Sequence, residues 1–217
     1  MRYLTKSRFK LATECPTKLS YTRKKEYADQ SSSDKFLMAL AEGGYQVGEL
    51  AKYYFPGGHD IKSLDYKVSL DETNLHLKKD KTIVYEAAVS YKNLFIRIDV
   101  LKKNGNVFDL IEVKAKSFSS KESFVNKKNE IKAPWKPYLL DVAFQEYVLK
   151  KAFPKAIVRS HLMLADKDAL TSIEGLNQKF KLTPTSDGQT AVTINGSVSL
   201  DALGDKILTQ VNVREYV

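Results

Sequence analysis

Two acidic residues and one lysine have the types and spacing for metal-assisted chemistry: Asp99, Glu112 and Lys114. Each acid has apolar neighbours, and a carboxylate is costly to bury there unless it is paired or coordinates an ion. Carboxylate oxygens are the ligands that Mg²⁺ or Mn²⁺ prefers. Lys114 follows Glu112 by two residues, so in a strand both side chains point the same way. The three residues therefore predict a metal site with a cationic neighbour.

Hydrolysis of a phosphodiester bond suits this set of groups. The reaction needs oxygen ligands for a divalent cation and a means of activating water. Asp99 and Glu112 can hold the cation, and the backbone carbonyl of Val113 can complete its shell. Lys114 can orient or help to deprotonate the water and stabilise charge on the phosphate. We therefore expect Asp99, Glu112 and Lys114 to be catalytic.

The segment 94–116 must position these groups, and its pattern predicts a β-hairpin. Two apolar runs flank Lys-Lys-Asn-Gly-Asn, and Asn-Gly between alternating runs is a strong hairpin signal. Strict alternation assigns one face of the first strand to Leu94, Ile96, Ile98 and Val100, and the other face to Phe95, Arg97, Asp99 and Leu101. The segment 82–90 predicts a preceding antiparallel strand, with Glu86 on the face opposite Ile83, Tyr85, Ala87 and Val89.

Two helices are expected around this hairpin. The segment 138–153 has a strong helical pattern, and Asp141 and Gln145, four residues apart, project together from it. A strand is expected at 156–165, parallel to a hairpin strand because a long crossover precedes it. The segment 34–55 predicts a helix that carries Glu49. Its three glycines indicate close packing against a neighbour or a local break.

A basic segment with interleaved aromatic residues, 116–138, lies between the hairpin and the second helix. Its cations and rings, among them Lys116 and Trp135, suit phosphate backbones and unstacked bases. The net charge of +9 also favours an anionic partner. The alternative interpretation is a disordered or helical surface excursion.

The order of the motifs indicates a family. Asp99 followed by Glu112-Val113-Lys114 resembles the PD-(D/E)xK nuclease superfamily. The stretches LTKSRFKLATECPTKL, GYQVGELAKYYFPGG, VYEAAV, IDVL, IEVKAKS and YLLDVAFQEYVL together resemble the RecB-like nuclease module of a bacterial family in which a second conserved domain usually follows. CRISPR-associated RecB-like nucleases are more remotely similar. The resemblance implies an α/β (α+β mixed) fold with a restriction-endonuclease-like core, a mixed central β-sheet flanked by helices.

The resemblance also implies roles for further residues. Gln145 matches a substrate-contacting glutamine motif, with Asp141 and Tyr147 beside it, although the tyrosine spacing differs from the usual Gln-x-x-x-Tyr. A first-helix histidine that binds metal in many relatives is replaced by Gly48, and Glu49 or Glu86 can compensate as metal ligands. Some relatives bind an iron–sulfur cluster through four cysteines, but Cys15 is the only cysteine here, so no iron–sulfur cluster is expected.

These observations predict a nuclease domain at 1–165. A C-terminal extension is expected at 166–217, with short strands about Asp187-Gly188 and Asn195-Gly196 and a helix at 201–211; truncation before a following domain is consistent with the family. The expected function is Mg²⁺- or Mn²⁺-dependent hydrolysis of nucleic acid, DNA foremost. Two alternatives stay open: an inactive module that binds nucleic acid or a protein partner, and a structural domain in which the acids form salt bridges. No apolar span or secretory signal is evident, so a cytoplasmic protein without membrane contact is expected.

Overall fold

The computed structural model describes residues 2–22, 24–27, 34–184, 190–194 and 201–217. Within these ranges the chain forms a seven-stranded mixed sheet in the order β2-β3-β4-β5-β6-β9, with β1 also paired to β4. The bounds of these strands are β1 Leu4–Thr5, β2 His59–Asp60, β3 Lys81–Tyr91, β4 Leu94–Asn104, β5 Val107–Phe118, β6 Ile157–Asp166 and β9 Leu208–Asn212. A separate hairpin joins β7 Phe180–Pro184 to β8 Thr190–Ile194.

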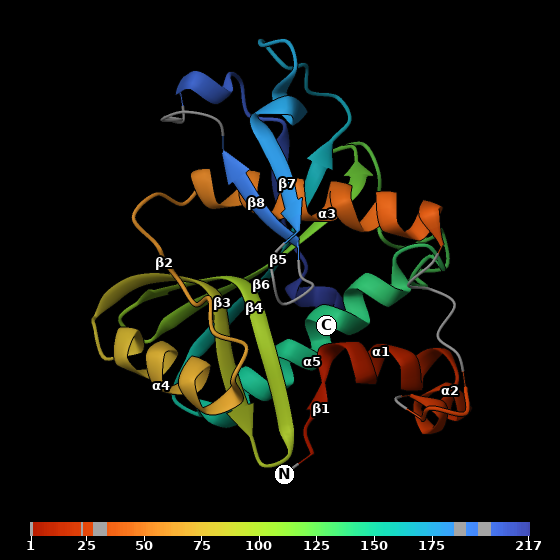
Figure 1. Cartoon of the computed structure of the whole chain (residues 1–217), viewed down its shortest axis with the longest axis vertical. Helices are drawn as coiled ribbons and strands as arrows, with labels where there is room; N and C mark the ends of the chain where they lie inside the picture. Colours follow the sequence, from red (N-terminus) through yellow and green to blue (C-terminus); the bar gives the residue numbers. More distant parts are fainter. Residues whose placement is uncertain (1, 23, 28–33, 185–189, 195–200) are drawn as a thin grey trace.

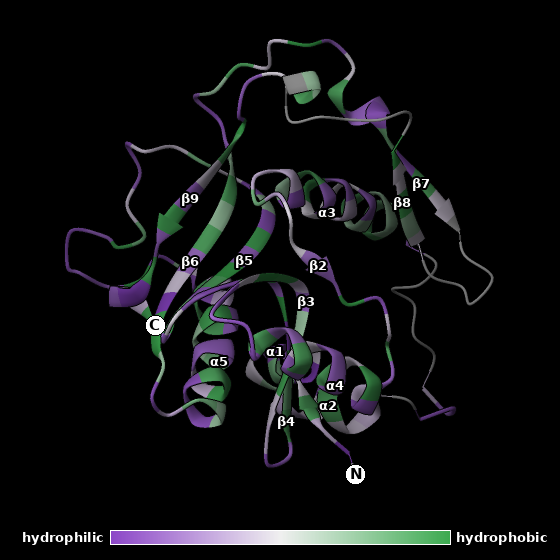
Figure 2. Cartoon of the chain, turned by 90° about the vertical axis from the view of Figure 1, so that its left-hand side faces the viewer, coloured by the Kyte–Doolittle hydropathy of each residue, from purple (hydrophilic) through white to green (hydrophobic). Residues whose placement is uncertain are grey.

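Helices cover both faces of the sheet. Their bounds are α1 Lys6–Glu14, α2 Pro16–Tyr21, α3 Lys35–Tyr53, α4 Tyr66–Leu77 and α5 Lys136–Ala152, with short 3₁₀ turns at Leu176–Lys179, Asp201–Leu203 and Arg214–Tyr216. Figure 1 shows α3 and the β7–β8 hairpin on one side of the sheet and α1 and α5 on the other. Figure 2 shows the same layers after a quarter turn, with α4 on the side of α1 and α5. No described helix is both long and apolar enough to cross a membrane.

Each face has its own core. The larger core joins α5 to apolar residues of the central strands, such as Ile98, Leu110 and Leu162. The smaller core joins α3 and the β7–β8 hairpin to residues such as Tyr85, Ile111 and Met163. On β5, Leu110 and Ile111 therefore face opposite ways, as alternation in a strand requires. Glu112 lies on the side of Leu110, toward α5.

The expected mixed sheet flanked by helices is confirmed, and so are the elements around the candidate acids. β4 and β5 form the predicted hairpin, and β6 pairs with β5 in parallel after the α5 crossover. The turn residues are Gly105 and Asn106, since Asn104 pairs with Val107. Gly105 has φ +59°, which glycine tolerates at the first central position of such a turn.

The predicted assignment of one continuous face to each of β3 and β4 is wrong, because each strand changes face partway along its length. Tyr85 lies in the smaller core, whereas Ala87 lies in the larger one. Val100 and Ile98 on β4 are separated in the same manner. Strict alternation would keep each of these pairs on one face. Glu86, with φ +54°, stands between them on β3, and this left-handed residue is where the alternation is interrupted.

The expected helix at 201–211 is also wrong. Residues Asp201–Leu203 form a 3₁₀ turn, and Leu208–Asn212 form β9, which pairs antiparallel with β6. β9 belongs to the central sheet, and Val213 lies in the larger core. Pairing of β7 with β8 agrees with strands on both sides of Asp187-Gly188; that dipeptide and Asn195-Gly196 lie outside the described residues.

The glycines of α3 mark neither close packing nor a break. The helix runs through Gly43, Gly44 and Gly48 without interruption. An added Cβ at any of the three would have no described atom within 4 Å. The apolar periodicity of the segment therefore prevails over the low helix propensity of its glycines.

Candidate metal and nuclease site

The site forms where β4 and β5 separate. Their pairing runs from Asn104↔Val107 to Val100↔Ile111, and the next residues along the strands are Asp99 and Glu112. Beyond the last backbone pair, the Asp99 side chain links the two strands: its Oδ2 accepts a hydrogen bond of 2.7 Å from the amide of Val113. The fork between the two strands thus holds both acids.

Lys6 enters this fork from the N-terminus. Strand β1 pairs with the first residues of β4, at Leu4↔Leu94 and Thr5↔Phe95. Helix α1 begins directly after β1, capped by the Thr5 side chain. This path places the Lys6 Nζ 2.8 Å and 3.0 Å from the two carboxylate oxygens of Glu112, and 3.7 Å from Asp99 Oδ1. One ammonium group is therefore shared by the two acids.

Helix α5 completes the surroundings of Glu112. Gln145 donates from Nε2 to Glu112 Oε2 at 2.8 Å, and both side chains are fully buried. Lys114 donates to Glu112 Oε1 and lies 3.0 Å from Asp141 Oδ2. The structure thus brings together Asp99, Glu112, Lys114, Asp141 and Gln145, as the spacing on the hairpin and on α5 indicates.

The acids differ in their protonation behaviour. Burial raises the pKa of Asp99 to about 7, Glu112 adds to the rise, and Lys6 and Lys114 oppose it. For Glu112, burial also favours the neutral form, but Lys6 and Lys114 together hold its pKa below the ordinary value. Burial likewise raises the pKa of Asp141, with Glu112 contributing. Glu112 is therefore the firmly charged acid, and Asp99 titrates near neutrality.

The lysines are held in the charged form. Burial alone lowers the pKa of Lys114, but Glu112 and Asp141 outweigh it, so the net pKa is raised. The pKa of Lys6 is raised in the same manner by Asp99 and Glu112. A protonated Lys114 can orient a water molecule and stabilise negative charge, but it has no free electron pair with which to accept a proton.

The two additional acids proposed as metal ligands lie in different surroundings. Glu86 is paired with Arg97 at 3.1 Å and also raises the pKa of Asp99 through charge repulsion, so it lies near the fork. Glu49 is on α3, which packs on the smaller core, and pairs with Lys52 at 2.9 Å. Glu49 is not brought to the Asp99–Glu112 pair.

Among the described residues, no hydrogen bond or ion pair joins the three other expected substrate contacts, Tyr147, Trp135 and Lys116, to the candidate acids. Tyr147 is half exposed, two residues from the inward-facing Gln145, and Lys151 lies over its ring. Trp135 is only 4% exposed and packs against Phe118 and Phe124. Lys116 lies 4.9 Å from the centre of that indole ring. In this structure Trp135 is a core residue whose faces are already covered.

The donor set fits a divalent cation with few protein ligands. Within the described ranges, no group of three or more His, Cys, Asp or Glu side chains is arranged to hold a metal ion. Mg²⁺ commonly keeps several waters and uses only one or two carboxylates, which Asp99 and Glu112 can supply. Two buried acceptors beside them, Asp141 Oδ1 and Gln145 Oε1, have no hydrogen-bond partner among the described residues. The site thus has spare oxygen acceptors suited to a hydrated cation.

Lys6 is the site residue that sequence reasoning missed. It is 106 residues from Glu112 in the chain, and an isolated lysine carries no periodic signal. The N-terminal stretch LTKSRFKLATECPTKL, part of the family resemblance, contains it and was the available pointer. No family model matches the chain, and no match was found among curated proteins.

Proposed function

We propose that the chain is a nuclease of the PD-(D/E)xK type, RecB-like branch, with a restriction-endonuclease-like core, which hydrolyses phosphodiester bonds with the aid of Mg²⁺ or Mn²⁺. DNA is the first candidate substrate, and the cytoplasm is the expected location. The proposal rests on one observation: Asp99 and Glu112 share a fork between adjacent strands, with Lys114 against Glu112. A bound cation would polarise the phosphate and lower the pKa of a water molecule.

The residues of the chain have separate roles in this proposal. Asp99 and Glu112 hold the cation, and Gln145 fixes the Glu112 carboxylate through its amide at 2.8 Å. Lys114, protonated, orients the attacking water and stabilises charge developing on the phosphate. Asp141, 3.0 Å from the Lys114 ammonium, holds that lysine in place. Participation of the Val113 carbonyl and of Glu86 stays a prediction.

Asp99→Asn tests the assignment with little change of shape. The amide oxygen of asparagine can still accept from the Val113 amide, but the charge that holds the cation is lost. We expect metal-dependent cleavage of labelled DNA or RNA to fall at least about a hundredfold, measured with Mn²⁺, with Mg²⁺ and with EDTA. Asp71→Asn, on the exposed face of α4, is the matched control. Cleavage that is unchanged by Asp99→Asn would refute the site.

One observation favours a second candidate, a module that binds nucleic acid or a protein without turnover. The Lys6 ammonium lies between the two acids and already neutralises part of their charge, as in a structural ion pair. In that case the intact protein would show no cleavage in Mn²⁺ or Mg²⁺, and adding either ion would not raise its melting temperature.

A further inference from the structure

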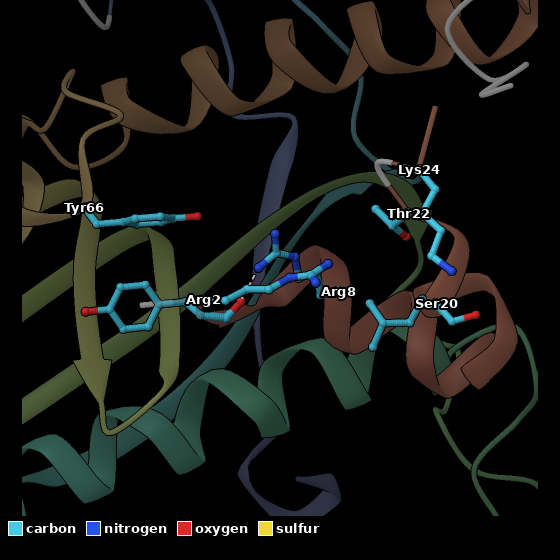
Figure 3. A pocket seen from close by; sticks show the side chains of 8 residues that line it. Arg2, Arg8, Ser20, Thr22, Lys24 and Tyr66 are labelled. Carbon is cyan, nitrogen blue, oxygen red and sulfur yellow. Dashed lines mark hydrogen bonds between the residues drawn. The ribbon is translucent and has the colours of Figure 1, made fainter. Parts of the chain in front are cut away.

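A second cationic feature lies close to α1, beside the N-terminal segment. A cavity of about 600 Å³ opens between the N-terminal segment, α2 and the start of α4. Figure 3 shows Arg2 and Arg8 between Tyr66 on one side and Ser20, Thr22 and Lys24 on the other. The same first turn of α1 supplies Lys6 to the acids and Arg8 to this cavity.

The lining of the cavity is positively charged. Arg2, Arg8 and Lys24 line it, and no acidic residue among those that the structure describes does so. Among the described residues, none of these three cations takes part in an ion pair with a carboxylate. Arg8 is oriented by a hydrogen bond from Nη1 to the carbonyl oxygen of Tyr3. Guanidinium groups that lack an internal carboxylate suit an external phosphate.

An aromatic face lies at the rim of the same cavity. Tyr66 is 37% exposed, and its ring is held by edge contacts with Tyr3 at 5.0 Å and Phe95 at 4.6 Å between ring centres. A fixed and partly exposed ring can stack with a nucleobase, which every base permits. Phosphate-binding cations and a stacking ring thus occur in one cavity.

We propose that this cavity binds one nucleotide of a single-stranded nucleic acid, with its phosphate at Arg2, Arg8 and Lys24 and its base on Tyr66. The inference rests on the proposed function, because it supplies a substrate contact for the same nuclease. A single strand is specified because a base can stack on Tyr66 only when it is free of its neighbours in a duplex.

The test measures binding without cleavage. Fluorescence anisotropy of a short labelled single-stranded oligonucleotide is recorded in EDTA over about 50 to 200 mM salt. We expect Arg2→Gln/Lys24→Gln to bind about tenfold more weakly than Lys78→Gln/Lys155→Gln, which removes the same charge from exposed positions elsewhere. The slope of log affinity against log salt should decrease by up to about 0.7, because the cavity holds one phosphate and each phosphate contact on a single strand contributes about 0.7.

A second variant tests the stacking contact. Tyr66→Leu should bind the oligonucleotide about fivefold or more weakly while keeping the salt slope, because stacking does not release counterions. Its circular dichroism and melting temperature establish that the variant is folded.

The outcomes separate this cavity from the catalytic assignment. Equal affinities for the two charge variants would overturn the cavity, whether or not the protein cleaves. Cleavage unaffected by Asp99→Asn would overturn the catalytic site and leave the binding result standing. If a free mononucleotide binds, and the cavity variants weaken its binding but not that of the oligonucleotide, the ligand is a nucleotide and the strand proposal is overturned.

Discussion

Lys6 raises the question of how a metal ion would enter a site that a protein cation already occupies. Its ammonium is 2.8 Å from Glu112 and 3.7 Å from Asp99. A divalent cation at these carboxylates would compete with it, because both are attracted by the same negative charge. The lysine can therefore stabilise the fork in the absence of a metal ion, and it would have to yield part of its contact if such an ion bound.

Lys6→Met tests this competition. Without metal, the variant should lose about 3 kcal/mol of stability, because a buried acid loses its partner. With Mn²⁺, its melting temperature should rise more than that of the wild type, since no ammonium has to be displaced. Lys10→Met, on the exposed side of α1, is the control in thermal unfolding followed by circular dichroism. A smaller Mn²⁺-induced rise in Lys6→Met than in the wild type would contradict the competition.

Local spacing allowed part of the candidate site to be predicted. Asp99, Glu112 and Lys114 follow from the hairpin, and Asp141 and Gln145 from helical periodicity, because each relation spans few residues. Local spacing could not predict that Lys6 lies at the site or that Glu49 lies away from it. The position of either residue depends on which face its helix packs against, and a contact of that kind is set by the whole fold.

At the scale of elements, the β4–β5 hairpin depends on one glycine. Gly105 has φ +59°, and its amide donates to Asp80 O at 2.9 Å. Alanine there would strain the backbone by about 1 to 2 kcal/mol but meet only ordinary contacts. Gly105→Ala should therefore lower the free energy of unfolding by about this amount, measured with urea.

Gly43→Ala in α3 is expected to have the opposite effect and to raise the free energy of unfolding. Its added methyl group has open space, and alanine favours a helix interior by about 0.5 to 1 kcal/mol over glycine. The two substitutions should therefore shift the urea midpoint in opposite directions. A stabilising Gly105→Ala would show that the turn does not require a left-handed residue.

Elements with a clear local pattern were predictable, and elements defined by distant partners were not. The hairpin and α5 have strong alternation or helical periodicity. The segment 201–211 places Leu203, Ile207 and Val211 at four-residue spacing, which favours a helix locally. Its hydrogen bonds to β6 instead make residues 208–212 a strand, because sheet pairing prevails over weak local propensity.

At the scale of the whole molecule, β9 makes the C-terminal segment part of the central sheet, and His161 of β6 lies beside it, opposite Asn212. Burial lowers the pKa of His161 below the ordinary 6.5. As the pH falls below 6.5, the unfolded chain therefore binds the proton first, and protons favour unfolding. The stability that depends on neutral His161 is complete above this pH and is lost as the pH falls toward the lower pKa of the folded protein.

His161→Gln removes this titration. Between about pH 6.5 and pH 5, the wild type should lose more free energy of unfolding than His161→Gln does, measured by urea unfolding at each pH. Comparison of each protein with itself at pH 8 cancels any fixed effect of the substitution. Parallel curves for the two proteins would show that the histidine titrates alike in the folded and unfolded states.

The left-handed backbone of Glu86 has a cost in stability. A left-handed conformation costs a glutamate about 1 to 2 kcal/mol, whereas glycine would adopt φ +54° without that cost. Selection for stability alone would therefore favour glycine at this position. The glutamate instead pairs with Arg97 and raises the pKa of Asp99, so the negative charge at the fork comes with a cost in backbone strain.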